Sequence, residues 1–504
     1  MRLLVWILRR LFPAGRRRAS RTGSGGRRLP GRPLLAGGVL LLLLAAGTAG
    51  LAGRAVPALP AGAHAVLARP PTPSLPLLRP LAGREKPAGA ELTERLYVPV
   101  APAAAGPRAV SAAELRARWR QVARLVITEE AAQALATRWG PVGEGVIVVA
   151  DALAVSRQLL DMPQAIGVVA FDELSPAVRA LPLGGVDLLD RTVPNRLWPL
   201  RARWEVRAGQ AVPPSNRDPE GIGVLVLTGV TAPAEGEPGP ARASAARIAL
   251  FARSADVWHA SVRALGGGCA PGELPGCGGP VLRVLLDVGA DVVEFSGLHP
   301  GSRQEIAAWQ EALATLGVGS FGAGRNAAEA ARPYTVDVRG TRVTFLGYAA
   351  GSRETTATPD EPGTNAYDPV RLRADIVRAR QAGADLVFVH IDYGEVYHAT
   401  PTADQRATFQ TAVEAGADLV VGTQPFVPQA FELHQGRPIF YGLGPFLVPE
   451  NGAYGPRGLV LQALVHRGKL LQVRPLVVAA GPEPRLLPAE ESTPFLATLA
   501  GWSD

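Results

Sequence analysis

The sequence predicts an α/β fold, because helical stretches alternate with short apolar strands along most of the chain. The clearest sign is a unit that occurs three times in the C-terminal half, at 287–295, 381–389 and 414–421. In each unit a helical stretch ends at Gly-Ala-Asp, where the glycine can take the left-handed conformation that closes a helix. The apolar, β-branched run that follows is typical of a strand buried on both faces of a parallel sheet.

The distribution of charged residues along the chain limits the classes of partner that the protein is expected to bind. The 504 residues carry a formal net charge of +8, but ten Arg lie in the first 33 residues and no acid precedes Glu85. Subtracting these ten charges from +8 leaves −2 for the remainder, so the positive excess is confined to the N-terminus. The sequence therefore predicts no nucleic-acid partner.

The N-terminal element predicted after the basic segment 1–33 is a transmembrane helix at 34–53. These twenty residues are Leu, Ala, Gly and Val with one Thr and no charge, long enough to cross a bilayer. Basic residues before the span predict a cytoplasmic N-terminus, so we expect a single-pass protein of the cell membrane with its folded domains outside. The alternative is a cleaved signal peptide, although its apolar core is usually shorter.

Two further segments precede the C-terminal domain. Residues 54–88 are rich in Pro, Ala, Leu and Arg, which is typical of an extended linker. Residues 89–214 are predicted to form a small α/β domain, whose helix at 111–119 opens with a capping box of Ser111 and Glu114. Its strands are expected at 125–128, 145–150 and 166–171.

The second domain is predicted at 222–482, followed by a tail at 483–504. It opens with a strand at 223–229 and contains a probable β pair at 334–347. Two further strands close it, at 459–466 and 469–478. The mostly β-α-β order predicts a mixed or largely parallel sheet with right-handed crossovers.

The chain has two cysteines, Cys269 and Cys277, separated by a loop rich in Pro and Gly. An exported compartment favours oxidation, so we predict a structural disulfide between them. The alternative is a metal or redox pair, but this spacing is no standard ligand pattern and no further ligands lie nearby.

Polar clusters follow the three strands of the Gly-Ala-Asp units. The carboxyl ends of strands in open α/β sheets are where ligands bind. If the strands share one parallel sheet, their clusters should meet at one edge. The candidate catalytic residues at this edge are His299, His390, Asp392 and Glu395, and the candidate ligand-binding residues are Thr423 and Gln424.

The string at 414–422, followed by 429–432 and 439–444, resembles the capsule-synthesis CapA family, which is associated with poly-γ-glutamate export. The resemblance covers roughly 222–480 and has supporting segments at 227–232, 290–297 and 389–395. It implies a calcineurin-like, metallophosphatase-type domain with a mixed-sheet α/β fold at the cell envelope.

The first domain is similar to half of a periplasmic solute-binding module. The similarity lies at 96–100, at 166–176 and in Val186-Asp187. Such a segment precedes the capsule-type domain in some membrane-anchored members of the family. No ligand-binding residue can be transferred onto it.

The family's site resembles that of two-metal phosphoesterases, in which Asp, His and Asn ligands at strand ends hold the metals. This chain departs from the pattern: the first carboxylate is absent from 228–230, Asn and Glu are absent from 257–263, and every His is absent from 422–426. Arg263 would also repel a cation. What remains of the motifs is His299, His390, Gly394 and Glu395.

We therefore expect no cofactor; if a divalent metal binds, His299 and His390 are its ligands, and otherwise they form hydrogen bonds at strand ends. The favoured function is a binding or scaffold component of the envelope rather than an enzyme. Its expected partners are the membrane and an anionic polymer such as polyglutamate or capsule-synthesis proteins. The alternatives are an active metal-dependent hydrolase of an envelope polymer or phosphoester, and a solute sensor.

Overall fold

A computed structural model describes residues 78–81, 91–103, 108–120, 124–207, 209–232, 247–263, 279–298, 300–351, 354–448 and 455–501. The predicted membrane span at 34–53, the pair Cys269 and Cys277, and His299 lie outside these residues. Among the helices that the structure describes, none is both long and apolar enough to cross a membrane. The mixed α/β class predicted from the sequence is confirmed.

The N-terminal part of the described chain forms one sheet with the strand order β1-β7-β2-β5-β3-β4, and β6 pairs with β2. Its elements are β1 (Leu78–Pro80), β2 (Glu91–Pro102), α2 (Ala112–Arg120), β3 (Leu125–Thr128), α3 (Glu129–Trp139), β4 (Val146–Val149), α4 (Ala152–Asp161), β5 (Ile166–Ala170), β6 (Val178–Ala180) and β7 (Arg201–Val206). The helix and three strands predicted here are confirmed as α2, β3, β4 and β5. β1 lies inside the predicted linker 54–88 and pairs with β7.

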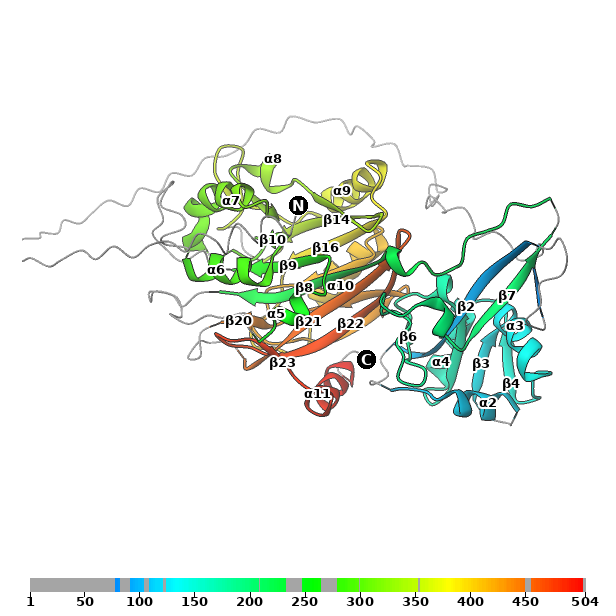
Figure 1. Ribbon diagram of the computed structural model, residues 1–504. Helices are drawn as coiled ribbons and strands as arrows, with labels where there is room; N and C mark the ends of the chain where they lie inside the picture. The colour runs from blue at the N-terminus through cyan, green and yellow to red at the C-terminus, as the bar shows by residue number, and fades with distance from the viewer. Residues whose placement is uncertain are drawn as a thin grey trace, which may run out of the picture. The chain divides into compact units, whose positions relative to one another are not determined.

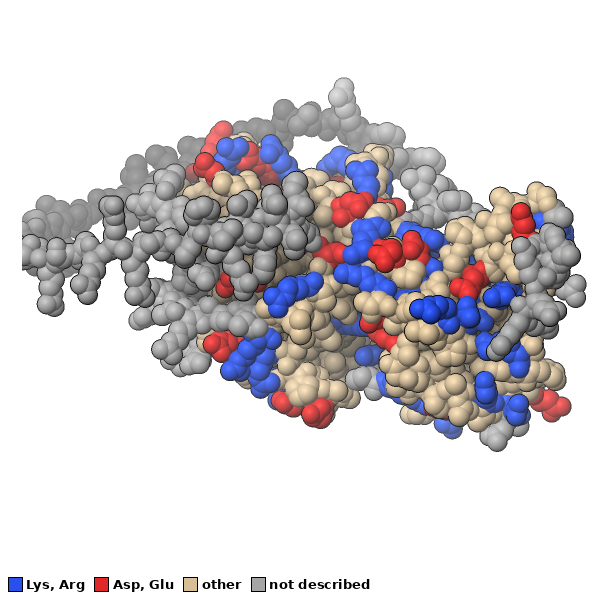
Figure 2. Space-filling model, in the orientation of Figure 1, with Lys and Arg blue, Asp and Glu red and all other residues tan. Residues whose placement is uncertain are grey.

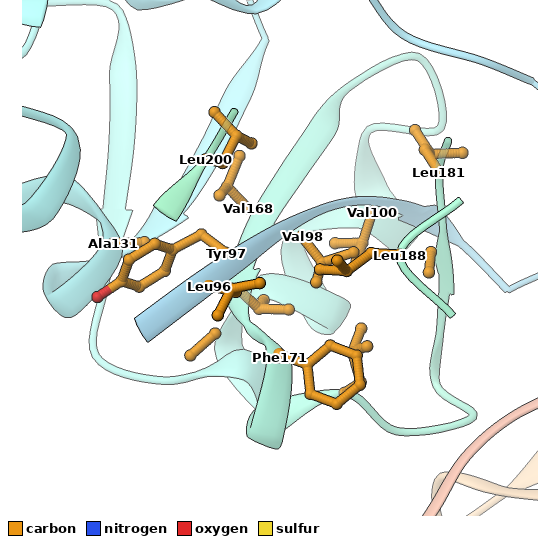
Figure 3. Close-up of a cluster of buried hydrophobic side chains, with 14 of the residues drawn as sticks. Leu96, Tyr97, Val98, Val100, Ala131, Val168, Phe171, Leu181, Leu188 and Leu200 are labelled. Atoms are coloured by element: carbon orange, nitrogen blue, oxygen red, sulfur yellow. The ribbon is translucent and has the colours of Figure 1, made fainter. Parts of the chain in front are cut away.

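The apolar core of this part lies around β2. Its residues Leu96, Tyr97, Val98 and Val100 are at most 1% exposed, and Figure 3 shows them among side chains from the neighbouring elements. Tyr97 reaches polar partners from inside the core, because its hydroxyl donates to Glu130 at 2.8 Å. The consecutive buried residues of β2 explain why this strand lies in the middle of its sheet.

The C-terminal part contains an eight-stranded sheet with the order β11-β10-β9-β8-β21-β22-β23, in which β20 pairs with β8. Its elements are β8 (Ile222–Thr231), α5 (Ala249–Ala252), β9 (Val257–Val262), α6 (Gly279–Val288), β10 (Val292–Glu294), α7 (Ile306–Thr315), β11 (Gly319–Phe321), β20 (Pro445–Leu447), β21 (Arg457–His466), β22 (Lys469–Ala479) and β23 (Arg485–Leu486). Strands β8 to β11 are parallel, whereas β21 joins β8 antiparallel.

A second sheet of six strands has the order β13-β14-β16-β17-β19-β18. Its elements are β13 (Tyr334–Val338), β14 (Thr341–Ala349), α9 (Pro369–Gln381), β16 (Leu386–Asp392), α10 (Ala403–Glu414), β17 (Leu419–Gly422), β18 (Phe431–His434) and β19 (Arg437–Phe440). The β pair predicted at 334–347 is confirmed as β13 and β14. Smaller elements are β12 (Ala323–Gly324), α8 (Ala327–Ala330), β15 (Gly363–Thr364) and α11 (Ala489–Gly501).

The two sheets of the C-terminal part pack face to face. One apolar cluster combines residues of both sheets, such as Leu227 and Val257 from one with Phe345 and Phe388 from the other. A second cluster joins the eight-stranded sheet to α6 and α7, and a third joins the six-stranded sheet to α9 and α10. The layers are therefore helix, sheet, sheet and helix, with the elements labelled in Figure 1.

The Gly-Ala-Asp units end their helices as predicted, since Gly289, Gly383 and Gly416 all have positive φ. The structure adds a role for the aspartates at the starts of the strands. The N–H of each aspartate donates to the carbonyl of one residue on the neighbouring strand, and its carboxylate accepts the N–H of that same residue. The pairs are Asp291 with Trp258, Asp385 with Arg342, Asp418 with Val387 and, before β9, Asp256 with Val224. We call these pairs the aspartate clasps.

The described surface mixes both signs of charge. On the face drawn in Figure 2, acidic and basic side chains lie next to one another. A nucleic acid would be attracted by a continuous basic stripe. The absence of a nucleic-acid partner stays a prediction from the sequence.

Candidate functional site

A cluster of polar side chains is buried between the two sheets of the C-terminal part. His259 comes from β9, Glu294 ends β10 and His390 lies in β16, three strands labelled in Figure 1. One potential ligand atom of each residue lies within 4.8 Å of the other two. All three residues are at most 1% exposed, so the cluster is enclosed by protein. We call it the inner cluster.

The two imidazoles of the inner cluster pack against each other. Their ring centroids are 4.4 Å apart, and His259 also stacks on Phe345 with an interplanar angle of 13°. Within the described residues, no ring nitrogen of His259 or His390 has a hydrogen-bond partner. Burial lowers the pKa of His259 to about 3. Burial, followed by the nearby His259, also lowers the pKa of His390 well below its usual value, so both rings are neutral at physiological pH.

The carboxylate of Glu294 is fixed by two donors. The hydroxyl of Ser261 donates to Oε2 at 2.6 Å, and the backbone N–H of Ser296 donates to Oε1 at 2.7 Å. Burial raises the pKa of Glu294 to about 7, although both serines favour the charged form. Since a carboxylate has about four lone-pair positions, acceptor capacity remains for a further partner.

A second polar group lies nearer to the strand ends and is organised by Arg263. Its Nη1 lies 3.3 Å from Oδ1 of Asp392, and its Nη1 and Nη2 donate to Oε1 of Gln424 at 3.3 and 3.2 Å. The hydroxyl of Thr423 donates to the same Oδ1 of Asp392 at 3.3 Å. The guanidinium also lies over the ring of Phe426, 4.9 Å from its centroid. We call Arg263, Asp392, Thr423 and Gln424 the outer cluster.

Burial raises the pKa of Asp392, and the charge of Arg263 together with the hydroxyl of Thr423 opposes that shift. The guanidinium is therefore the cation that balances this buried carboxylate. Because the guanidinium neutralises this carboxylate, the ion pair offers a metal cation no net negative charge.

The candidate residues predicted from the sequence do not all lie together. Asp392, Thr423 and Gln424 lie together in the outer cluster, whereas His390 belongs to the inner one. Glu395 does not join them, because its side chain is 61% exposed and pairs with His398 at 3.6 Å. His299 lies outside the described residues.

The expectation that one parallel sheet unites the three clusters is wrong. β10 belongs to the eight-stranded sheet, while β16 and β17 belong to the six-stranded sheet. Glu294 and His390 nevertheless meet, because the two sheets stack and bring side chains from their facing surfaces together. The polar residues converge across the space between sheets rather than along a single edge.

Sequence reasoning missed His259 and Glu294. The signal that could have found them is a repeated spacing of two residues: His259 with Ser261, Glu294 with Ser296, and His390 with Asp392. Residues two apart in a strand point to the same face, so three strands each carry an inner and an outer polar position.

The outer cluster does not fit the two-metal site of the family resemblance. Among the described residues near Arg263, Asp392 supplies a carboxylate, whereas Thr423 and Gln424 supply neutral groups. A two-metal centre acts by clamping the attacking and leaving oxygens of a substrate between its ions. A guanidinium is chemically suited to anionic groups rather than to metal cations.

Comparisons with known proteins find relatives over part of the chain. Residues 281–450 match the family described as bacterial capsule synthesis protein PGA_cap. The capsule biosynthesis protein CapA of Bacillus anthracis is 31% identical over 180 residues, which cover 34% of this chain and 43% of that protein. The PGA biosynthesis protein CapA of Bacillus subtilis (strain 168) is 30% identical over 132 residues, 26% of this chain and 34% of that protein.

The chain thus spans less than half of the length of these two curated relatives. Among solved structures, a hypothetical protein from Thermus thermophilus is similar with a TM-score of 0.34 and 15% sequence identity. That similarity covers 51% of this chain and 98% of the other.

Proposed function

We propose that the chain is a CapA-like component of the cell envelope in poly-γ-glutamate capsule synthesis or export, because its segment 281–450 matches the capsule-synthesis family. The support is the family match together with two relatives whose names state capsule or PGA biosynthesis. We also propose that its stacked sheets form a metallophosphatase-type domain whose metal site is degenerate.

The observation that carries the proposed activity is the placement of Arg263. Its side chain is 16% exposed and is held by Asp392 and Gln424. A guanidinium has five N–H donors in a planar fork, more than these contacts use. The remaining donors suit a carboxylate, which is the charged group of each residue of poly-γ-glutamate. The outer cluster is thus proposed to bind the polymer rather than to hydrolyse it.

Arg263→Ala is expected to weaken binding of poly-γ-glutamate to the full chain at least tenfold. Arg263→Lys should bind with intermediate affinity, because an ammonium cannot form the bidentate contact. The measurement is the dissociation constant at several salt concentrations. The matched control is Arg325→Ala, which removes the same charge from a side chain that is 65% exposed and pairs with Glu329.

Equal affinities of Arg263→Ala and the unchanged chain would contradict the proposal.

The alternative function, an active hydrolase, makes a different prediction for the same protein. Turnover of bis(p-nitrophenyl) phosphate with added Mn²⁺ or Zn²⁺, lost in Asp392→Asn, would favour that alternative. The proposed solute-binding role of 89–214 is tested separately, by ligand screening.

We propose that 34–53 anchors the chain in the cell membrane, with 1–33 in the cytoplasm. The support is the Arg-rich segment before an uncharged apolar stretch of twenty residues. Protease added to spheroplasts with an intact membrane should degrade the folded domains and spare an epitope placed within 1–33. The control is permeabilised spheroplasts, in which both are degraded. Full protection of the folded domains would contradict this topology.

A further inference from the structure

We propose that His259, Glu294 and His390 form a binding site for a single divalent transition-metal ion between the two sheets. This inner cluster lies deeper than the outer cluster: His390 precedes Asp392 by two residues on β16, and His259 precedes Arg263 by four. It shares His390 with the metal ligands that the family resemblance implies. Two of its three members, His259 and Glu294, lie outside the motifs of that resemblance.

The geometry suits one ion. Ligand atoms at about 2.0–2.1 Å from a tetrahedral ion lie roughly 3.3–3.5 Å from one another. The three ligand atoms of the inner cluster already lie within 4.8 Å of one another. Small rotations of the side chains would therefore bring them to coordination distance, with no movement of one sheet along the other.

The chemistry of the donors indicates the class of ion. Two neutral imidazoles and one carboxylate are a ligand set that zinc takes in proteins, and imidazole favours Zn²⁺, Fe²⁺ and Ni²⁺ over Mg²⁺ and Ca²⁺. The carboxylate is oriented by Ser261 and Ser296, in the way that metal-binding carboxylates are held by a surrounding layer of donors. We therefore take Zn²⁺ as the first candidate.

A second observation, independent of the distances between ligand atoms, is that polar atoms of the two imidazoles are buried without hydrogen-bond partners. In the described residues, both nitrogens of His259 and both of His390 are buried without a hydrogen-bond partner. Such atoms are rare in folded proteins, because a buried polar atom without a hydrogen-bond partner loses the bonds that it made to water. Phe321 and Phe345 surround the rings with apolar surface rather than with acceptors. An ion would give each ring a partner.

The burial of the inner cluster also indicates what the bound ion would do. Its three ligands are at most 1% exposed, so a polymer or phosphoester cannot reach them. The ion would join β9 and β10 of one sheet to β16 of the other, as a structural cross-link inside the sandwich. The proposed polymer-binding function needs Arg263, and the metal site does not, so each proposal can fail without the other.

The test uses the full chain, purified in detergent, treated with chelator and then incubated with Zn²⁺ alone. We expect about one zinc per chain by elemental analysis after gel filtration, and visible absorption bands of tetrahedral Co²⁺ when cobalt replaces zinc. His259→Gln, His390→Gln and Glu294→Gln should each lower bound zinc at least tenfold. The matched control is His466→Gln, which changes another buried histidine, 2% exposed, whose Nε2 accepts the N–H of Asp218.

If the ligand variants do not fold, a second variant and a second measurement test the zinc site. Ser261→Ala keeps the three ligands and removes one donor to Glu294, so it should weaken zinc affinity at least tenfold. X-ray absorption of the zinc-loaded unchanged chain should show two imidazoles and oxygen in the coordination shell. Absence of zinc from the folded unchanged chain, a shell without imidazole, or full zinc retention by folded ligand variants would overturn the proposal. Arg263→Ala should keep its zinc.

Discussion

Gly422→Ala is expected to destabilise the chain by about 3 kcal/mol, the upper range for overpacking a rigid site. A Cβ at Gly422 would lie 1.9 Å from the carbonyl oxygen of Tyr441 and 2.6 Å from its carbonyl carbon. Both are backbone atoms, so the clash cannot be relieved by rotating a side chain. Phe409 lies 3.0 Å away and restricts movement further. β17 must shift, and Thr423 in the outer cluster must shift with it.

The measurement is the midpoint of denaturant unfolding, followed by a signal from the C-terminal part. The matched control is Gly351→Ala, since Gly351 is exposed and a Cβ there would meet nothing within 4 Å. This control should change the free energy of unfolding by less than about 0.5 kcal/mol. Equal midpoints for the two variants would show that β17 does not approach Tyr441 so closely.

Arg217→Met is expected to destabilise the N-terminal part by about 3–4 kcal/mol, since it leaves several buried acceptors without a donor. Arg217 is 1% exposed, and its guanidinium donates to four acceptors of a single loop. The acceptors are the carbonyls of Leu188, Asp190 and Val193 and the side-chain oxygen of Asn195. The methionine fills a similar volume but leaves these acceptors unpaired, and each unpaired acceptor costs about 1–3 kcal/mol.

Arg217→Lys should recover only a small part of that stability, because an ammonium group cannot span acceptors placed around a planar fork. The control is Arg116→Met, a change at an exposed position of α2. The measurement is thermal unfolding, with hydrogen exchange of 188–195 as a local signal. If the exchange of that loop is the same in Arg217→Met as in the unchanged chain, the guanidinium does not hold it.

The sequence predicted those parts of the fold that depend on local pattern. The glycine of each Gly-Ala-Asp unit ends a helix because no Cβ opposes its positive φ, and this requirement can be read without a structure. The strand at 125–128 is predicted for a similar reason, since a β-branched run between turn signals is typical of a buried strand.

Membership of the two sheets could not be predicted from the same patterns. An apolar run indicates that both faces of a strand are covered, but it does not indicate which strand lies beside it. β10 and β16 follow the same unit, yet β10 pairs with β9 and β11, whereas β16 pairs with β14 and β17. Contacts between segments far apart in the sequence determine which strands pair. The sequence of one chain gives little information about such contacts.

The candidate site was predicted only in part, because the sequence does not show which strands lie next to one another. Asp392, Thr423 and Gln424 end neighbouring strands of one sheet, so their proximity follows from the order of the strands. His259 and Glu294 complete the inner cluster from the other sheet, and motif comparison treated both as ordinary strand residues. Glu395 was placed wrongly because it comes after β16 has ended, where the turn carries its side chain into solvent.

The aspartate clasps fix the alignment of each strand with its neighbour. The residues that form the clasps are different from those that form the inner and outer clusters. Asp256, Asp291 and Asp418 hold the beginnings of their strands, while the inner and outer polar residues lie toward the opposite ends. Replacing an outer polar side chain therefore leaves these contacts in place, unlike replacing Gly422, whose added Cβ would meet the backbone of Tyr441. Strand alignment and the polar clusters are thus carried by different residues of the same strands.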